Sequence, residues 1–379
     1  MTDSAATLLQ QFYQFLRYCI DDSQPVPASI GQMDWEGLFV FCEEQAILGI
    51  GYRGLEPLSR PLPEGERRLK LPKVLLFTWY AAYEQIAARN KELNRKAAEI
   101  CRRFDEDGFE CCLLKGQGNA AMYSDPLART PGDIDVWIKL KDYKIEKLKN
   151  RKRKRKAVTD YVRQRHEVTG LRYHHVEYEE EGVPVEVHFT PCTMNNPFYD
   201  RRLQRWFREE FRTEKRRLAD VGEVEVPTAE SNVVYQLAHM MHHFFDEGLG
   251  LRQVMDYYIL LHDSQSMAHQ WRDELEYLNL YHFAGAVMYV LREVFGMEEQ
   301  HMIVPVDEWR GRTLLREIME GGNFGRSEGR WKLSAGKGKK YFVKIWRNLH
   351  FVWQYPAEAL CEPVFRTWHF FWRLAQTKL

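Results

Sequence analysis

Apolar residues recur at helical spacing through the first part of the chain. In residues 5–20 and 34–48 every third or fourth position is apolar, which predicts two amphipathic helices. Residues 73–107 keep the same period over a longer stretch, with aromatic residues at the start and charged residues in the second half. We expect those aromatics to pack in a core rather than to stack on bases. Residues 1–108 are therefore predicted to form an N-terminal helical region.

The period changes from helical spacing to alternation in the middle of the chain. Residues 109–115, with the apolar run Cys111 to Leu114, are predicted to form the first strand, and apolar and polar residues alternate in residues 171–178 and 183–190, a pattern that predicts half-buried strands. Three glutamates and Gly182 separate the last two segments, so these segments are predicted to form a hairpin with a glycine turn.

Two further segments complete this part of the chain. Residues 198–215 are charged with interspersed aromatics and are predicted to be helical. Residues 223–227 (EVEVP) read as a short strand at a sheet edge, because proline cannot donate a hydrogen bond to a neighbouring strand. Residues 109–228 are thus expected to form a small mixed sheet with few helices.

Helical patterns return after residue 228 and are rich in aromatic residues. Thr228 or Ser231 can cap a helix that runs to about Phe245, and residues 251–262 predict a second helix. Residues 321–340 are rich in glycine, serine and lysine and predict a loop. The pattern indicates an α+β (mixed) fold, with the 109–228 core flanked by residues 1–108 and by a C-terminal helical domain at 229–379.

Two aspartates open the strand that follows residue 131. In Gly132-Asp-Ile-Asp-Val-Trp137 the acids alternate with apolar residues, so Asp133 and Asp135 should share one face of the strand. Like charges this close repel one another unless a positive charge lies between them. A divalent cation with oxygen ligands meets that need, although a polar strand end facing solvent would give the same pattern.

A third acid lies on the predicted hairpin. Glu186 alternates with Val185 and Val187, so its side chain should lie on the polar face of its strand. Three carboxylates on adjacent strands are typical of a two-metal site, which makes Asp133, Asp135 and Glu186 candidate ligands for Mg²⁺ or Mn²⁺. His188 shares the face of Glu186, and it could contact the substrate or support the metal as well as be a hydrogen-bonded structural histidine.

Basic residues near the acids are candidate phosphate ligands. Lys115-Gly116 ends the first strand before a predicted short helix, so it offers an ammonium group and a backbone N–H to an anion. Arg129, in the loop between Asp125 and Pro131, could clamp phosphate or orient the aspartates, or it could be solvated. Arg252 could pair with Asp256 four residues later, or it could face the cleft and bind phosphate.

Composition limits the classes of function. The chain has 379 residues with 54 basic and 54 acidic side chains, so the whole molecule is not attracted to nucleic acid or to a membrane surface. The seven cysteines have no spacing typical of a zinc site, and reduced thiols fit a cytoplasmic protein. We find no signal peptide and expect no segment that spans a bilayer.

One local charge excess departs from this balance. Residues 139–156 hold eleven Lys or Arg and end in Arg-Lys-Arg-Lys-Arg-Lys (151–156). Such a run can bind nucleic acid or polyphosphate, or it can form a solvated helix. Nucleic-acid binding is the weaker interpretation, because aromatic residues are not interleaved with the basic ones. A second feature, His239 and His243 four residues apart, could hold zinc but lacks a third ligand at a telling spacing.

The motifs together resemble a known family. Lys115-Gly116, Arg129, Gly132-Asp-Ile-Asp135 and Val185-Glu-Val-His188, with GLGLRQVMDYYILL at 248–261, resemble the uncharacterised nucleotidyltransferase family of the polymerase-beta superfamily. The resemblance covers roughly residues 70–265. Many members of the superfamily carry Gly-Ser before the paired acids, whereas this chain has Lys115-Gly116 and Gly118-Asn119. A serine contact to the triphosphate is therefore not transferred to this chain.

The resemblance implies a magnesium-dependent, ATP- or other NTP-binding transferase. Asp133, Asp135 and Glu186 would hold two metal ions, and an NMP would pass from an NTP to an unknown hydroxyl acceptor. Lys115, Gly116 and Arg129 would steady the phosphates. Two alternatives remain open at this point: a non-catalytic member that binds a nucleotide or a partner, and a nucleic-acid-modifying enzyme that uses residues 151–156.

Overall fold

A computed structural model of the chain describes residues 3–21, 23–59, 70–141, 151–218, 221–263, 270–323 and 337–376. The N-terminal helices are α1 (Asp3–Ile20), α2 (Trp35–Glu44), α3 (Leu48–Ser59) and α4 (Lys73–Glu106), with a 3-10 turn at Ala28–Gln32. The middle of the chain holds the helices α5 (Gln117–Ala120), α7 (Arg151–Arg165) and α8 (Pro197–Glu209). The C-terminal helices are α9 (Ala229–Asp246), α10 (Leu251–Asp263), α11 (Trp271–Tyr277), α12 (Tyr281–Val290), α13 (Glu308–Gly321), α14 (Lys337–Leu349) and α15 (Pro356–Gln376), with a π-helical turn at Leu291–Phe295 and a 3-10 turn at Glu299–His301.

A seven-stranded mixed sheet lies at the centre of the described chain, in the order β3-β4-β5-β2-β1-β7-β6. The strands are β1 (Phe109–Leu113), β2 (Ile134–Leu140), β3 (Val168–Leu171), β4 (His175–Glu180), β5 (Val183–His188), β6 (Thr213–Leu218) and β7 (Gly222–Pro227). Strand β2 runs antiparallel to β1 and parallel to β5. The mixed sheet with helical units on both sides confirms the predicted α+β class.

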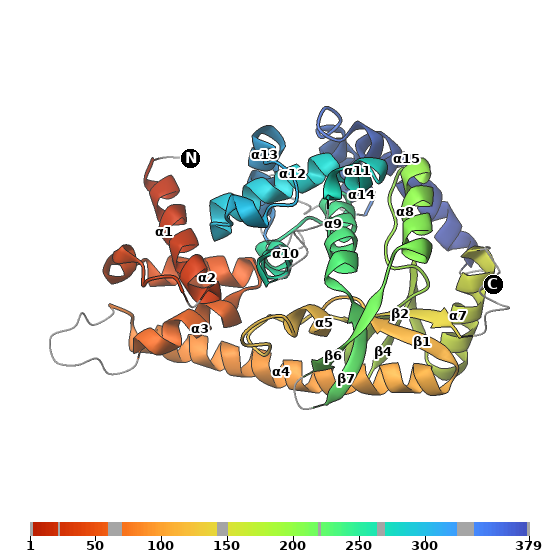
Figure 1. The fold of residues 1–379 in the computed structure, drawn as a ribbon, viewed down its shortest axis with the longest axis horizontal. Coiled ribbons are helices and arrows are strands. Elements are labelled where there is room, and N and C mark those ends of the chain that lie inside the picture. Colours follow the sequence, from red (N-terminus) through yellow and green to blue (C-terminus); the bar gives the residue numbers. More distant parts are fainter. Residues whose placement is uncertain are drawn as a thin grey trace.

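The two faces of the sheet are covered by different helices. Long helix α4 runs along one face (Figure 1), where it packs together with α7 on aliphatic side chains such as Ile134, Val136 and Val185. On the opposite face Trp137 of β2 packs on Phe207 and Phe211, at and just after the end of α8. Helix α9 rises from this second face (Figure 1). The period-two alternation of β2 therefore separates an aliphatic face from a polar and aromatic one.

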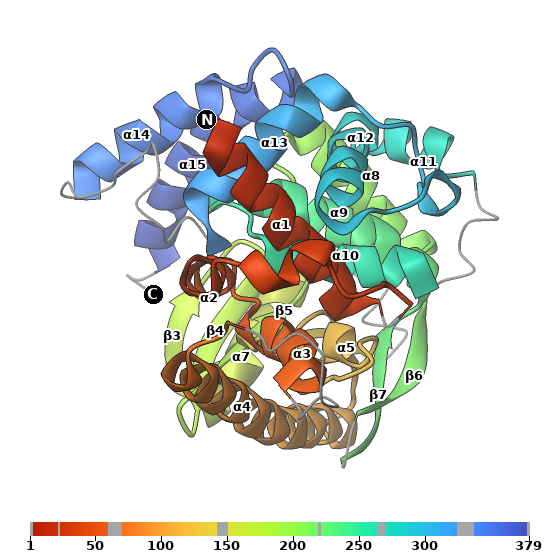
Figure 2. The same ribbon diagram turned by 90° about the vertical axis from the view of Figure 1, so that its left-hand side faces the viewer.

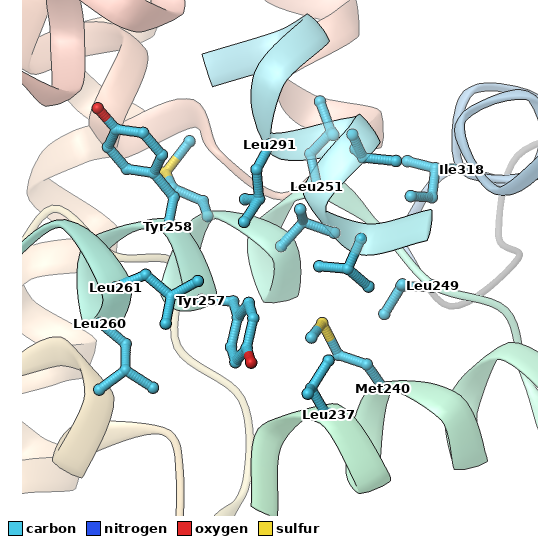
Figure 3. Packing of buried hydrophobic residues seen from close by; sticks show 14 of the residues in the cluster. Leu237, Met240, Leu249, Leu251, Tyr257, Tyr258, Leu260, Leu261, Leu291 and Ile318 are labelled. Carbon is cyan, nitrogen blue, oxygen red and sulfur yellow. The ribbon is translucent and has the colours of Figure 1, made fainter. Parts of the chain in front are cut away.

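The N-terminal and C-terminal helices share one hydrophobic core. Helix α1 lies against the C-terminal helices (Figure 2), and its Arg17 donates hydrogen bonds to the carbonyls of Glu293 and Val294. Leu237 of α9, Leu251 of α10 and Ile318 of α13 belong to the same hydrophobic cluster (Figure 3). The predicted three-part division at residues 108 and 228 stays a prediction, although helices from its first and third parts pack together here.

Helix α3 was not predicted, because its glycines obscured the helical pattern. A Cβ at Gly51 would lie 2.7 Å from the Trp79 ring, and a Cβ at Gly54 would lie 2.3 Å from Cys19 Sγ. The glycines let α3 approach its neighbours closely, and this packing offsets their low helix propensity.

One helix prediction and one strand prediction were wrong in the same region. Residues 213–215 were predicted to end a helix but begin strand β6, because α8 ends at Glu209 and β6 pairs along the whole of β7. Strand β7 consequently lies between β1 and β6, and not at the sheet edge. Pro227 is its last residue, where the missing N–H is tolerated. The hairpin prediction is confirmed by β4 and β5, whose turn places Glu181 and Gly182 at positive φ.

The basic run is partly described. Residues 142–150 lie outside the described part of the chain, and residues 151–156 form the first turns of α7. Most of the predicted loop at 321–340 also lies outside it. No helix among the described residues is long and apolar enough to cross a membrane.

Candidate functional site

The two aspartates of the Asp-Ile-Asp motif line one pocket, on the polar face of the sheet. Strand β2 begins at Ile134, so Asp133 lies just before the strand and is half-buried, while Asp135 lies within it and is 1% exposed. Ile134 and Val136 point into the aliphatic core on the opposite face. Both aspartates contribute to the wall of the pocket, together with residues from α5, α9 and α10.

Lys115 neutralises Asp135 from the end of β1. Its Nζ lies 3.0 Å from Asp135 Oδ1. Burial lowers the pKa of Lys115, but Asp135, Asp133 and Glu186 outweigh burial and hold the pKa above its usual range, so the side chain stays charged. Gly116 follows at φ +59°, and a Cβ there would lie 3.3 Å from the Asp133 carbonyl oxygen. The turn that delivers Lys115 to the site therefore favours glycine.

The parallel pairing of β2 and β5 places Glu186 directly beside Asp135. The register aligns Asp135 with Glu186 and Trp137 with His188. His188 is 1% exposed, and its Nε2 lies 3.0 Å from Asp135 Oδ1 and 3.3 Å from Glu186 Oε2. The structure thus brings together Lys115, Asp135, Glu186 and His188, four residues that were predicted from three separate segments.

These contacts fix the charges of the cluster. Burial opposes the charged form of His188, but hydrogen bonds to Asp135 and Glu186 outweigh it and raise the pKa of His188 to about 9. Burial likewise opposes ionisation of Glu186, but His175, His188 and Lys115 lower its pKa to about 2. At neutral pH His188 is therefore protonated, Lys115 keeps its charge and Glu186 is ionised.

One oxygen of the cluster has no hydrogen-bond partner. Asp135 Oδ2 is buried, and no donor among the described residues reaches it. Buried carboxylate oxygens are costly to leave unpaired, so this atom marks a position for an added cation or water. Asp135, Glu186 and His188 each offer one ligand atom, and these atoms all lie within 4.8 Å of one another. Asp133 stands outside this group but lines the same pocket.

Arg129 is buried and anchors a loop to α10. It is 5% exposed, and its Nε and NH2 each lie 2.7 Å from an oxygen of Asp256. Tyr123 and Asn119 donate to the same carboxylate at 2.7 and 3.2 Å. The interpretation of Arg129 as a solvated loop residue was wrong. Two of its donors fix the loop before Asp133, which is a positioning contact.

Arg252, four residues before Asp256 on α10, contacts the same loop. Its NH1 donates to the carbonyls of Thr130 and Pro131 at 3.1 and 3.2 Å, and its side chain lines the pocket. Burial, and then the neighbouring Arg129, lower the pKa of Arg252 to about 10. A buried cation at the wall of an acid-lined pocket is placed to meet an anion.

Sequence reasoning missed several pocket residues on helices, namely Asn119, Tyr235, Gln236 and Gln253. His239 and Asp256 also line the pocket, but the sequence indicated them only as partners of His243 and Arg252. A signal was present in α9, where Asn232, Gln236, His239 and His243 recur at intervals of four, three and four on one helical face. Polar residues on one face of a helix that is apolar elsewhere indicate a lined cavity.

The possible zinc pair of α9 forms a ring–ring contact. Nε2 of His239 lies 3.2 Å from Nε2 of His243. Within the described ranges, neither ring belongs to a group of three potential metal ligands. A tetrahedral zinc site needs further ligands, so the pair by itself does not make one.

Comparisons with known proteins agree with the motifs. A crystal structure of an antigenic nucleotidyltransferase-like protein from Paracoccidioides brasiliensis is similar to this chain at 11% identity and a TM-score of 0.37, over 59% of this chain and 97% of that one. The identity and the TM-score are too low to support a conclusion about fold or function. No curated protein matches the sequence. The model of the family described as uncharacterised nucleotidyltransferase matches residues 31–296, which is more than half of the chain and more than the 70–265 expected from the motifs. The chain therefore belongs to the uncharacterised nucleotidyltransferase family.

Proposed function

We propose that the protein transfers an NMP from an NTP to a hydroxyl acceptor at the pocket below α9. The observation that carries this proposal is the register of β2 and β5, which sets Glu186 beside Asp135 next to the half-buried Asp133. Asp133 and Asp135 line the pocket, and acids on adjacent strands beside such a pocket are the arrangement that two-metal phosphoryl transfer uses. Membership of a nucleotidyltransferase family supports the same reaction.

The residues present fit a pair of Mg²⁺ or Mn²⁺ ions. Asp133, Asp135 and Glu186 would supply the hard oxygen ligands that these ions prefer, and the unpaired Asp135 Oδ2 fits a ligand role. When bound, such ions neutralise the negative charge that develops on the reacting phosphate. Lys115 lies 3.0 Å from Asp135 and would contact a phosphate oxygen of a nucleotide bound at this pocket.

The other residues of the pocket hold and orient the triphosphate. Lys115 and Arg252 bring positive charge to the wall of the pocket, which Gly116 also lines. Helix α5 contains only four residues, so its dipole adds little, and side-chain cations would do most of the binding. Arg129 would act through Asp256 by fixing the loop.

Glu186 fits the role of metal ligand better than that of general base. Its pKa of about 2 makes it a weak proton acceptor at neutral pH, whereas an efficient base titrates near the working pH. His188 bridges Glu186 and Asp135 and would hold both carboxylates in place.

The test is a calorimetric titration of each NTP with Mg²⁺, followed by a transfer assay with labelled nucleotide. The wild type should bind at least one NTP, and the Asp133→Asn/Asp135→Asn variant should not. Asp273→Asn, an exposed acid on α11, serves as the matched control. Wild-type transfer by Asp133→Asn alone would remove the proposal. Binding that needs metal but gives no transfer with any acceptor would favour a non-catalytic nucleotide-binding protein.

A second candidate, a role on nucleic acid, has one observation in its favour. Arg155 of α7 lies over the Trp372 ring at 4.7 Å, so α15 brings aromatic residues to the basic helix. Trp368 and Phe371 of α15 are 45% and 63% exposed. Basic and aromatic side chains together bind single strands. If this role is correct, single-stranded RNA should bind with a steep salt dependence that is lost when Lys152, Arg153 and Lys154 are made neutral, whereas a flat response would exclude it.

A further inference from the structure

Three histidines gather at one end of the β4–β5 hairpin, beside the carboxylate cluster. We propose that His174, His175 and His188 bind a transition-metal ion of the zinc class, in a site separate from the Mg²⁺ site. One nitrogen of each ring lies within 4.8 Å of one nitrogen of both others. The ring centroids are 4.4 Å apart for His174 and His175, 5.0 Å for His175 and His188, and 5.5 Å for His174 and His188.

The hairpin itself brings the rings together. His175 begins β4 and pairs directly with His188, the last residue of β5, so both side chains lie on the same face. His174 precedes the strand in a bend, and its carbonyl accepts hydrogen bonds from the backbone N–H groups of Phe189 and Thr190 at 3.1 and 3.4 Å. The bend lets the His174 ring turn to the same end of the hairpin as its two neighbours.

Two of the rings are oriented as metal-binding histidines usually are. Nε2 of His188 contacts Asp135 and Glu186, and Nε2 of His175 lies 2.9 Å from Glu177 Oε1. A carboxylate on one ring nitrogen leaves the other nitrogen for a metal and fixes the tautomer. Nδ1 of His175 and Nδ1 of His188 are both buried, and neither makes a hydrogen bond within the described part of the chain. Nδ1 of His175 does approach Glu186 Oε2 at 3.4 Å.

Helix α9 supplies a fourth ring. The His242 centroid lies 5.5 Å from that of His174, and His242 Nδ1 is also buried without a hydrogen bond to any described residue. The Thr193 backbone hydrogen-bonds the same ring and orients it. Three or four imidazoles match the ligand number of a tetrahedral site, and a metal ion on Nδ1 of His188 would replace the proton there.

The donor set decides the class of metal. Imidazole nitrogen suits Zn²⁺, Co²⁺, Ni²⁺ and Cu²⁺, whereas Mg²⁺ demands oxygen ligands. An ion held by the hairpin and α9 would fix His188, and through it Asp135 and Glu186. The site would therefore position the carboxylates, and its existence does not depend on nucleotidyl transfer.

The test is Co²⁺ titration of the full-length, metal-stripped protein with excess Mg²⁺ present, so that the carboxylates are occupied. We expect one Co²⁺ per chain, with the visible absorption of a four-coordinate nitrogen site, and displacement by Zn²⁺. His174→Ala and His175→Ala should each weaken Co²⁺ binding by at least about a hundredfold, because loss of a supporting residue alone costs ~10–100-fold. His282→Ala, at an exposed ring on α12, should bind as the wild type. Circular dichroism of each variant checks that it folds.

Several outcomes would overturn the proposal. One is the absence of Co²⁺ and Zn²⁺ binding. A second is unchanged binding in both hairpin variants, and a third is loss of binding in His239→Ala alone, which would assign the ion to the α9 pair. Asp133→Asn separates this proposal from the transfer reaction, because that variant should lose transfer and keep Co²⁺ binding.

Discussion

The two faces of strand β2 show how one short sequence serves two purposes. On one face Ile134, Val136 and Ile138 are at most 1% exposed and pack in the aliphatic core under α4 and α7. On the other face Asp135 is just as buried, but its neighbours are Lys115 and His188. The same degree of burial therefore has opposite effects on the free energy of folding at the two faces. Apolar burial stabilises the fold, whereas a buried acid costs free energy unless cations stay beside it.

The largest effect should come from a substitution at the polar face, and it should appear in the rate of transfer. Asp133→Asn removes a proposed metal ligand that is half-buried and outside the strand ladder. We expect the transfer rate to fall by about a thousandfold, because metal charge stabilisation is worth several kcal/mol and ~1.4 kcal/mol is tenfold in rate. The midpoint of thermal unfolding should stay near that of the wild type. A variant that lost stability as much as activity would contradict the division between the two faces.

A substitution on the aliphatic face should lower stability and leave NTP binding unchanged. Ile138 is fully buried, so Ile138→Ala should lower the free energy of unfolding by about 3 kcal/mol through lost burial and a residual cavity. Urea denaturation measures this change. Val74→Ala on α4, where the side chain is 79% exposed, should change stability by less than ~0.5 kcal/mol. NTP affinity of the folded Ile138→Ala protein should match that of the wild type.

Glu358, a buried acid away from the site, tests the cost of burying a carboxyl group through the pH dependence of stability. Glu358 of α15 accepts the backbone N–H groups of Asn195 and Asn196 at 2.8 and 3.2 Å, and no described lysine or arginine forms an ion pair with it. Burial raises the pKa of Glu358 to about 7, above its unfolded value of about 4.3. The stability this acid contributes is therefore complete below about pH 4.3 and is lost as pH rises through 7, by up to ~3 kcal/mol.

The measurement for Glu358 is the free energy of unfolding between pH 5 and 8. In Glu358→Gln this part of the pH dependence should vanish, so that the variant gains on the wild type as pH rises. Glu299→Gln, at an exposed position, should keep the wild-type slope. An unchanged slope in Glu358→Gln would mean that folding does not raise the pKa of this carboxyl group.

The smallest effect should come from the surface contact of α7 with α15. Arg155→Ala removes the guanidinium from the Trp372 ring and should lower the free energy of unfolding by about 0.5–1 kcal/mol. Arg153→Ala, one of the exposed basic residues of the same helix, is the control. Equal changes in the two variants would mean that the ring contact adds nothing to stability.

Local sequence patterns were sufficient to predict the structure where each residue's role depends on its neighbours in sequence. Alternation in residues 134–138 predicted which side chains enter the core, and the glycine turn predicted the β4–β5 hairpin. Local patterns failed where distant packing overrode them. The glycines of α3 are tolerated because Trp79 and Cys19 approach them, and β6 forms because β7 offers it a partner.

By itself, the sequence determined the strand that follows Asp133 and contains Asp135, the Lys115-Gly116 turn and membership of the family, because these depend on residues a few positions apart. Only the tertiary structure decided that Glu186 would stand beside Asp135, that Asp256 would bind Arg129, and that His242 would approach the hairpin. Such contacts join segments separated by tens of residues or more. Their geometry follows from strand order and helix packing, which no local period encodes.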